Sequence, residues 1–252
     1  MESIEISGLE LFGISNSRSS RYRLLKRLIE QGALYKVDGG YRVNVFSPIV
    51  WRRLYRCRGI EYTVYRALSL CGGVVTGVRV AGINCPNPYS SLDVYEVYVP
   101  LERADLFSAI IGLNEDLLVY PDTSVLYRTG FMKPVVIAYP LVKGIDYTVV
   151  DTVYGFQVGE AYLEQAFVDV VRGDFWFYTG IAFEIYYYIR RYIDPDKLLE
   201  IASRLGVEDR VYTVEFIVSN FIGKPSLFNI DPDKLVNVNM FEILGRLSDV
   251  LD

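Results

Sequence analysis

A helix-forming stretch followed at once by a small hairpin, between residues 15 and 45, constrains the fold more than any other part of the sequence. Apolar residues recur in it at the spacing of one α-helical face, namely Tyr22, Leu25, Leu28 and Ile29. Ser15 or Ser17 can cap the start of this helix, and Gly32 lies where a left-handed residue commonly ends one. We therefore expect an amphipathic helix that ends at Gly32.

Two strand-like runs follow this helix, at 33–37 and 41–45, with Asp38-Gly39-Gly40 between them. Glycine adopts the positive φ that tight hairpin turns require, so the pattern predicts a β-hairpin. A basic helix followed by a hairpin is typical of a winged helix-turn-helix, in which the recognition helix lies in the DNA major groove and the wing contacts the backbone. The sequence thus favours an N-terminal module that binds double-stranded operator DNA.

The helix face opposite the apolar residues carries the side chains that we expect to contact DNA. They are Ser19, Ser20, Arg21, Arg23, Lys26 and Arg27. Lys36 and Arg42 are the candidate contacts on the wing. Any amphipathic surface helix carries Lys and Arg on its solvated face, so the charge alone is weak evidence. The helix, the glycine and the hairpin together favour the DNA-binding interpretation.

The charge of the chain is distributed unevenly in a way that fits such a module. The formal net charge of the 252 residues is -5, which by itself disfavours a nucleic-acid binder. Residues 1–58, however, hold 11 Lys and Arg against 5 Asp and Glu, whereas residues 59–252 hold 15 against 26. Phosphate attraction is local, over roughly a Debye length of 8 Å. A basic head can therefore bind DNA while attached to an acidic body.

The predicted module has an unusually short lead. Residues 1–14 have room for one brief helix at most, whereas a winged helix normally has two helices ahead of the recognition helix. The segment 47–58 could supply a helix, because Pro48 suits a first helical turn and its apolar residues share one face, at Val50, Leu54 and Cys57. The arginines of this segment either add phosphate contacts or line a solvated surface, which is the commoner role.

The remainder, 59–252, alternates between strand-like and helical patterns up to about residue 160. We expect a helix over 60–70, strands over 74–84, 92–99, 117–120, 124–127 and 135–142, and a helix over 101–112. From about 160 four helix-like runs follow one another, and Asp194-Pro195 opens the third. The fold class is therefore α/β (α+β): a winged helix-turn-helix at 1–58, then a mixed-sheet α/β body with a helical C-terminal part.

The chain has 3 Cys and no His, which narrows its chemistry. Cys57, Cys71 and Cys85 form no CxxC pair, so we expect buried thiols, no metal site and no cofactor. The absence of His excludes Ser-His and Cys-His nucleophile pairs, and we expect no enzymatic activity. No apolar run approaches the ~20 residues that span a membrane, and no N-terminal signal segment is visible. We therefore expect a cytoplasmic protein without a membrane partner.

Two C-terminal segments carry a family resemblance. EAYLEQAFVDVVRG, with Glu164–Val171 as its centre, and the stretch Ile193–Gly206 follow the winged-helix pattern and the α/β body. This arrangement resembles the AbiEi-type antitoxins and their winged-helix transcriptional-regulator relatives. The resemblance covers most of the chain and involves no catalytic motif. It implies a protein that represses its own operon through its N-terminal module and counteracts a nucleotidyltransferase toxin through its body. The short N-terminal lead departs from the family pattern.

A structural role explains the same C-terminal residues equally well. In that interpretation Glu164, Asp169 and Asp196 cap or solvate helices, while apolar neighbours fill the core. An antitoxin needs no chemistry there, only a stable surface.

A nucleotidyltransferase-like enzyme is the main alternative. Gly72-Gly73 ahead of a strand, followed by Asp93, faintly resembles the arrangement in which an Asp-x-Asp strand holds divalent ions. Here Tyr95 occupies the second carboxylate position, and Glu96 would point to the opposite face of a regular strand. Such a site would be degenerate.

A second alternative is a winged-helix transcription factor whose body senses a small ligand. Aromatic residues at 175–178 and 186–188 could line a pocket or an interface, although aromatics at helical spacing are more often core. Palindromic operators are usually bound by two copies, so we also expect a homodimer. Heavy use of Tyr, Val and Ile hints at an archaeal or thermophilic source.

Overall fold

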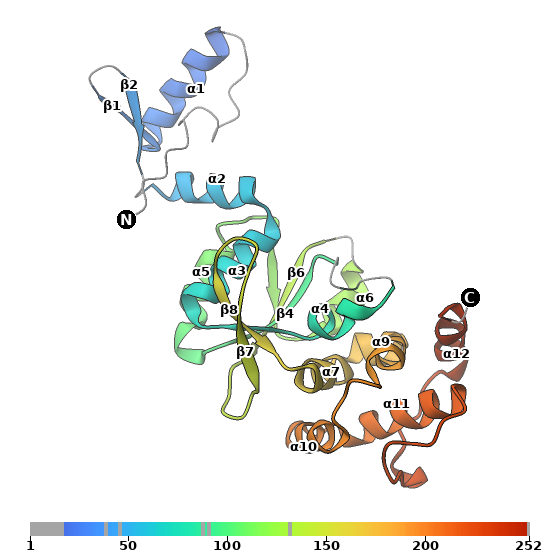
Figure 1. The fold of residues 1–252 in the computed structure, drawn as a ribbon. Helices are drawn as coiled ribbons and strands as arrows, with labels where there is room; N and C mark the ends of the chain where they lie inside the picture. Colours follow the sequence, from blue (N-terminus) through green and yellow to red (C-terminus); the bar gives the residue numbers. More distant parts are fainter. Residues whose placement is uncertain are drawn as a thin grey trace.

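A computed structural model describes residues 18–37, 40–44, 47–86, 89, 92–130 and 133–250, and leaves out the side chains of residues 18–22, 37, 40, 42, 57 and 84. In these residues a helix and a hairpin at the N-terminal end stand apart from a central mixed sheet, and helix α2 lies between the two (Figure 1). A helical C-terminal part packs on the other side of the sheet. The protein is therefore a mixed α/β protein.

The strands are short. They are β1 (Leu34–Val37), β2 (Gly40–Val43), β3 (Val74–Thr76), β4 (Val94–Val99), β5 (Leu118–Tyr120), β6 (Val135–Pro140), β7 (Tyr147–Asp151) and β8 (Gln157–Ala161). Among the described residues, six of them form the central sheet in the order β5-β6-β4-β3-β8-β7. β3 pairs antiparallel with β4, and β7 with β8, while the other neighbours are parallel. The sheet is thus mixed, as the sequence predicts.

Helices occupy much of the remaining described chain. The α-helices are α1 (Arg18–Glu30), α2 (Pro48–Arg58), α3 (Ile60–Cys71), α4 (Val78–Ala81), α5 (Ala104–Ile111), α6 (Leu126–Thr129), α7 (Leu163–Arg172), α8 (Asp174–Tyr178), α9 (Ile181–Ile189), α10 (Pro195–Leu205), α11 (Glu208–Phe221) and α12 (Met240–Asp249). Single 3-10 turns are η2 (Gly82–Asn84), η4 (Leu101–Arg103), η5 (Thr123–Val125) and η6 (Pro232–Lys234). None of the helices in the described ranges combines the length and apolarity of a membrane span.

The predicted N-terminal helix and hairpin are confirmed as α1 and the antiparallel pair β1 and β2. Gly32 has a φ of 69° and ends the helix as expected. Ile29, on the apolar face predicted for this helix, is 38% exposed, whereas Leu28 is buried with Leu34 of the hairpin. The caps Ser15 and Ser17 and the turn at Asp38-Gly39 lie outside the described residues.

Helix α2 completes the small core of the N-terminal part. Val50 and Leu54 are buried against Leu28 of α1 and Leu34 of β1. The helix predicted for the segment 47–58 is confirmed as α2, with Pro48 in its first turn. The helices that a complete winged helix has ahead of α1 would fall in residues 1–17, which lie outside the described chain. The described N-terminal part consists of α1, the β-hairpin β1-β2 and α2.

Strand β4 is covered on both faces. Val94 and Tyr98 lie in the cluster formed with α7 and α9, whereas Tyr95 and Val97 lie in the cluster formed with α3 and α5. All six of its residues are buried. A strand with two covered faces can be apolar throughout, which explains the run VYEVYV and leaves Glu96 as its one ionisable carboxylic acid.

Two strand predictions are wrong. The strand expected over 74–84 ends at Thr76, because Gly77 takes a φ of 65° and turns the chain into α4. A Cβ at Gly77 would overlap the Glu96 carboxylate, so glycine is needed there. The strand expected over 124–127 is instead η5 followed by α6, since Asp122 accepts the Ser124 backbone N–H (2.8 Å) and starts a helical turn. The hairpin of β7 and β8 was not predicted.

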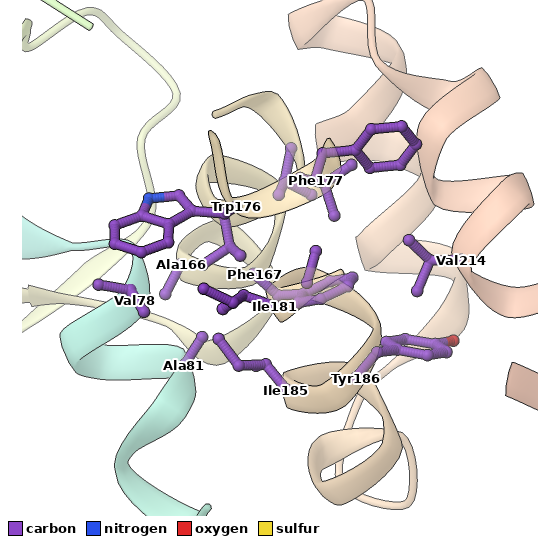
Figure 2. Close-up of a cluster of buried hydrophobic side chains, with 14 of the residues drawn as sticks. Val78, Ala81, Ala166, Phe167, Trp176, Phe177, Ile181, Ile185, Tyr186 and Val214 are labelled. Carbon is purple, nitrogen blue, oxygen red and sulfur yellow. The ribbon is translucent and has the colours of Figure 1, made fainter. Parts of the chain in front are cut away.

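The four helix-like runs expected from about residue 160 form α7, α9, α10 and α11, whereas β8 takes the start of the first run and the unpredicted α8 lies between the first two. Asp194 caps α10 by accepting the backbone N–H groups of Asp196 and Lys197, and Gly206 ends it with a φ of 69°. Its core is aromatic: Phe167, Trp176, Phe177 and Tyr186 are fully buried (Figure 2). The rings of Phe167 and Tyr186 stack at 4.9 Å between centroids.

A buried ion pair fastens the chain after α11 to this core. Arg190 donates to both Glu215 oxygens (2.9 and 2.7 Å) and to the Pro225 carbonyl (2.7 Å). Glu215 is fully buried and also accepts the Leu227 backbone N–H (2.6 Å). The Glu215 carboxylate therefore holds both the end of α9, through Arg190, and the chain after α11, through Leu227.

We predict that Arg190→Ala lowers the free energy of unfolding by about 3–5 kcal/mol, because it leaves Glu215 buried without its counter-ion. Arg191→Ala is the matched control: Arg191 is exposed beside the Tyr192 ring, and its removal should cost less than about 1 kcal/mol. Urea denaturation followed by circular dichroism measures both. Equal losses in the two variants would contradict the role given to Glu215.

Candidate nucleic-acid interface

Three of the predicted DNA contacts on α1 have side chains that the structure describes, and they lie on its exposed face. Arg23, Lys26 and Arg27 are all exposed. Lys26 lies 3.9 Å from Glu30 one turn away, with both side chains about two-thirds exposed. Exposed pairs of this kind contribute little and are screened by salt, so Lys26 remains available to an anion. α1 has no acidic residue in its first turn.

The other predicted contacts lie on the same unit. Ser19, Ser20 and Arg21 belong to the first turns of α1, and their side chains fall outside the described set. Lys36 is exposed on β1, and Arg42 lies on β2 opposite Tyr35 in the hairpin register. All eight predicted residues thus lie on α1 or on the hairpin beside it, but the register places positions 36 and 42 on opposite faces of that hairpin.

The unit from α1 to α2 is strongly basic. Residues 18–58 contain 11 Lys and Arg but only Glu30 and Asp38 as acids. The unit stands away from the sheet (Figure 1), so its field is opposed only where the body approaches it. A polyanion is the partner that such a surface fits.

A second set of polar residues, not predicted from the sequence, is buried between the sheet and α7. Asp169 accepts the hydroxyls of Thr76 (2.6 Å) and Tyr98 (2.5 Å), and Gln165 lies 3.3 Å from both of its oxygens. The Arg172 guanidinium lies 3.8 Å from Asp169 and stacks on the Tyr139 ring. The proposed capping or solvated role is therefore wrong for Asp169, because the residue faces the sheet rather than a helix end.

Glu96 lies beside this network on β4. Its carboxylate accepts the Val78 backbone N–H (2.9 Å) and the Tyr139 hydroxyl (3.1 Å). Burial raises the pKa of Glu96 to about 7, and it raises the pKa of Asp169 as well. A carboxylic acid in the middle of an apolar strand was the sequence feature that could have indicated this network.

The resemblance segment Glu164–Val171 has a structural role in α7. Glu164 accepts the Asp194 backbone N–H (3.0 Å) and so joins the start of α7 to the start of α10. This is the capping role expected for Glu164. Its neighbour Gln165 belongs to the buried network described above.

The residues of the nucleotidyltransferase-like alternative do not form a carboxylate pair on β4. Asp93 and Tyr95 line one hollow, while Glu96 is buried on the opposite face of the strand. Glu61 also lines this hollow, but it pairs with Arg79 (3.2 Å) and accepts the Tyr154 hydroxyl (3.2 Å). Gly72 ends α3 in a left-handed conformation, and Gly73 leads into β3, where both have backbone roles.

The cysteines and aromatics are mostly core. Cys71 and Cys85 are buried free thiols, as predicted, and burial raises the pKa of Cys85 to about 12. The described residues contain no group of three or more His, Cys, Asp and Glu side chains suited to a metal. Tyr187 and Tyr188, in contrast to the buried Tyr186, line a hollow at the ends of α9 and α11.

Comparisons with known proteins return no match: no family model, no curated protein and no solved structure is similar to this chain.

The raised pKa of Glu96 makes the stability of the folded protein depend on pH. The unfolded chain loses this proton near pH 4.5 and the folded chain near pH 7, so the free energy of unfolding should fall by up to about 3 kcal/mol as pH rises through that window. Glu96→Gln should remove much of this fall and raise stability at pH 8.

Thermal and urea unfolding at pH 5, 6, 7 and 8 would measure the effect. Glu102→Gln, an exposed position on η4, is the matched control and should keep the wild-type pH dependence. A Glu96→Gln profile parallel to that of the wild type would show that Glu96 is charged throughout this range.

Proposed function

We propose that this chain is a DNA-binding transcriptional regulator and antitoxin. In this proposal the unit from α1 to α2 acts as a winged-helix module, with α1 as recognition helix in the major groove and β1 and β2 as the wing. It binds operator DNA and represses the chain's own operon. The body counteracts a nucleotidyltransferase toxin encoded next to it.

One observation carries the DNA-binding part. A helix with exposed Arg23, Lys26 and Arg27 is followed at once by a hairpin with exposed Lys36, and both stand away from the central sheet. A purely structural unit of this size needs no excess of nine cations over acids in residues 18–58. Phosphate binding accounts for that excess.

The body's role is supported by a different kind of evidence. The segments Glu164–Val171 and Ile193–Gly206 resemble the antitoxin family, and both serve as scaffold in this fold. Glu164, Asp169 and Asp194 in these segments accept internal hydrogen bonds, which suits a protein that acts through its surface rather than by catalysis. The acidic charge of residues 59–252 fits a protein partner better than DNA.

We predict that Arg23→Ala with Arg27→Ala weakens binding to the chain's own upstream DNA. An arginine that reads a base contributes about 1–3 kcal/mol to the preference for the specific sequence. An arginine that contacts a phosphate contributes about 1 to the slope of log binding constant against log salt concentration. Fluorescence anisotropy with upstream and scrambled duplexes at two salt concentrations separates the two roles.

Arg191→Ala with Arg204→Ala removes the same charge from the turn after α9 and from α10, and is the control. Wild-type protein that binds neither duplex at low salt would overturn the DNA-binding proposal. Unchanged affinity in the double variant Arg23→Ala, Arg27→Ala would overturn the assignment of α1 as the recognition helix.

The antitoxin role has a separate test. Expression of the toxin encoded by the neighbouring gene should stop the growth of host cells, and co-expression of this chain should restore it. The double variant Arg23→Ala, Arg27→Ala should restore growth equally, because the proposal assigns neutralisation of the toxin to the body. Colony counts measure both results when this chain is expressed from a promoter that it does not repress. No rescue by the wild type would reject the antitoxin role, and rescue lost in the double variant would move it from the body to the N-terminal unit.

A further inference from the structure

The basic surface of α1 continues onto α2 through a hollow of about 470 Å³. Arg27 of α1 forms one side of it, and α2 forms the other with Arg52, Arg53 and Arg56. Helix α2 contains no acidic residue. Four guanidinium groups around one hollow repel each other, and an anion placed between them relieves that repulsion.

Two carboxylates of the body lie close to the arginines of α2. Glu115 lines the hollow and lies 3.9 Å from Arg52, and its neighbour Asp116 lies 3.9 Å from Arg56. All four side chains are more than half exposed. Long, solvated ion pairs of this kind are weak and easily screened, so a phosphate can replace the carboxylates.

The partner that fits is a nucleic-acid backbone. Arg52 and Arg56 are one helical turn apart on an open, exposed surface, so they can contact successive phosphates of an extended polyanion. Arg27 belongs both to this hollow and to the proposed DNA-contacting face of α1. A duplex held by α1 therefore has its backbone beside α2.

We propose that α2 is a second phosphate-contacting element and that the turn carrying Glu115 and Asp116 competes with DNA for its arginines. This inference rests on the proposed DNA-binding function and extends it. In the free protein the carboxylates occupy Arg52 and Arg56, and bound DNA displaces them. Because these ion pairs join α2 to the body, DNA binding also alters how the N-terminal unit is held.

Charge variants of opposite sign test the proposal by anisotropy with the upstream duplex, as a function of salt. Arg52→Gln with Arg56→Gln should reduce the salt slope by about 2 and weaken binding at low salt by about ten-fold or more. Glu115→Gln with Asp116→Asn should tighten binding by about two- to ten-fold.

Matched controls separate local effects from net charge. Glu242→Gln with Asp249→Asn makes the same charge change on α12, far from α1 (Figure 1), and should leave affinity within about two-fold. Arg52→Lys with Arg56→Lys should keep the wild-type salt slope. Melting curves verify that every variant folds.

The outcomes are distinct. Wild-type protein without DNA binding overturns the proposed function together with this inference. Wild-type binding with an unchanged slope in the Arg52 and Arg56 variant overturns this inference alone. Equal tightening in the two acid-neutralised variants overturns the competing role of Glu115 and Asp116.

Discussion

Burial of β4 on both faces is the constraint on which the structure depends. One face of this strand packs on α3 and α5, the other on α4 and α7, and the strand pairs with β3 and β6 at its edges. Placing Glu96 in such a strand requires donors from the surrounding elements, and Val78 and Tyr139 supply them. The turn at Gly77 is shaped by the same carboxylate.

The network around Asp169 extends this constraint to the helical C-terminal part. Thr76 and Tyr98 come from the sheet, while Asp169 and Arg172 come from α7, so the hydrogen bonds fix the helix in register against the strands. Apolar packing alone is less directional. Because the aromatic residues of α8 and α9 pack on α7, the hydrogen bonds that hold α7 on the sheet also position this aromatic core.

Helix α2 links two cores. Its residues Val50 and Leu54 pack with α1 and the hairpin, whereas Tyr55 packs in the cluster with α3 and α5. Gly59, with a φ of 88°, separates α2 from α3. A helix with both attachments can transmit a change at the basic surface to the sheet.

The sequence by itself determined the elements whose signals are local. Helix periodicity, the proline and aspartate caps and the glycine ends located α1 to α3, α10 and α11, and the paired strand-like runs located the first hairpin. Tertiary structure alone decided that Val78 begins a helix rather than extending a strand, and that β7 and β8 join the sheet. It also decided that Glu96 and Asp169 are buried together, 73 positions apart. Strand pairing and polar satisfaction depend on residues distant in sequence, so a local pattern can mark a buried acid such as Glu96 but does not identify its partners.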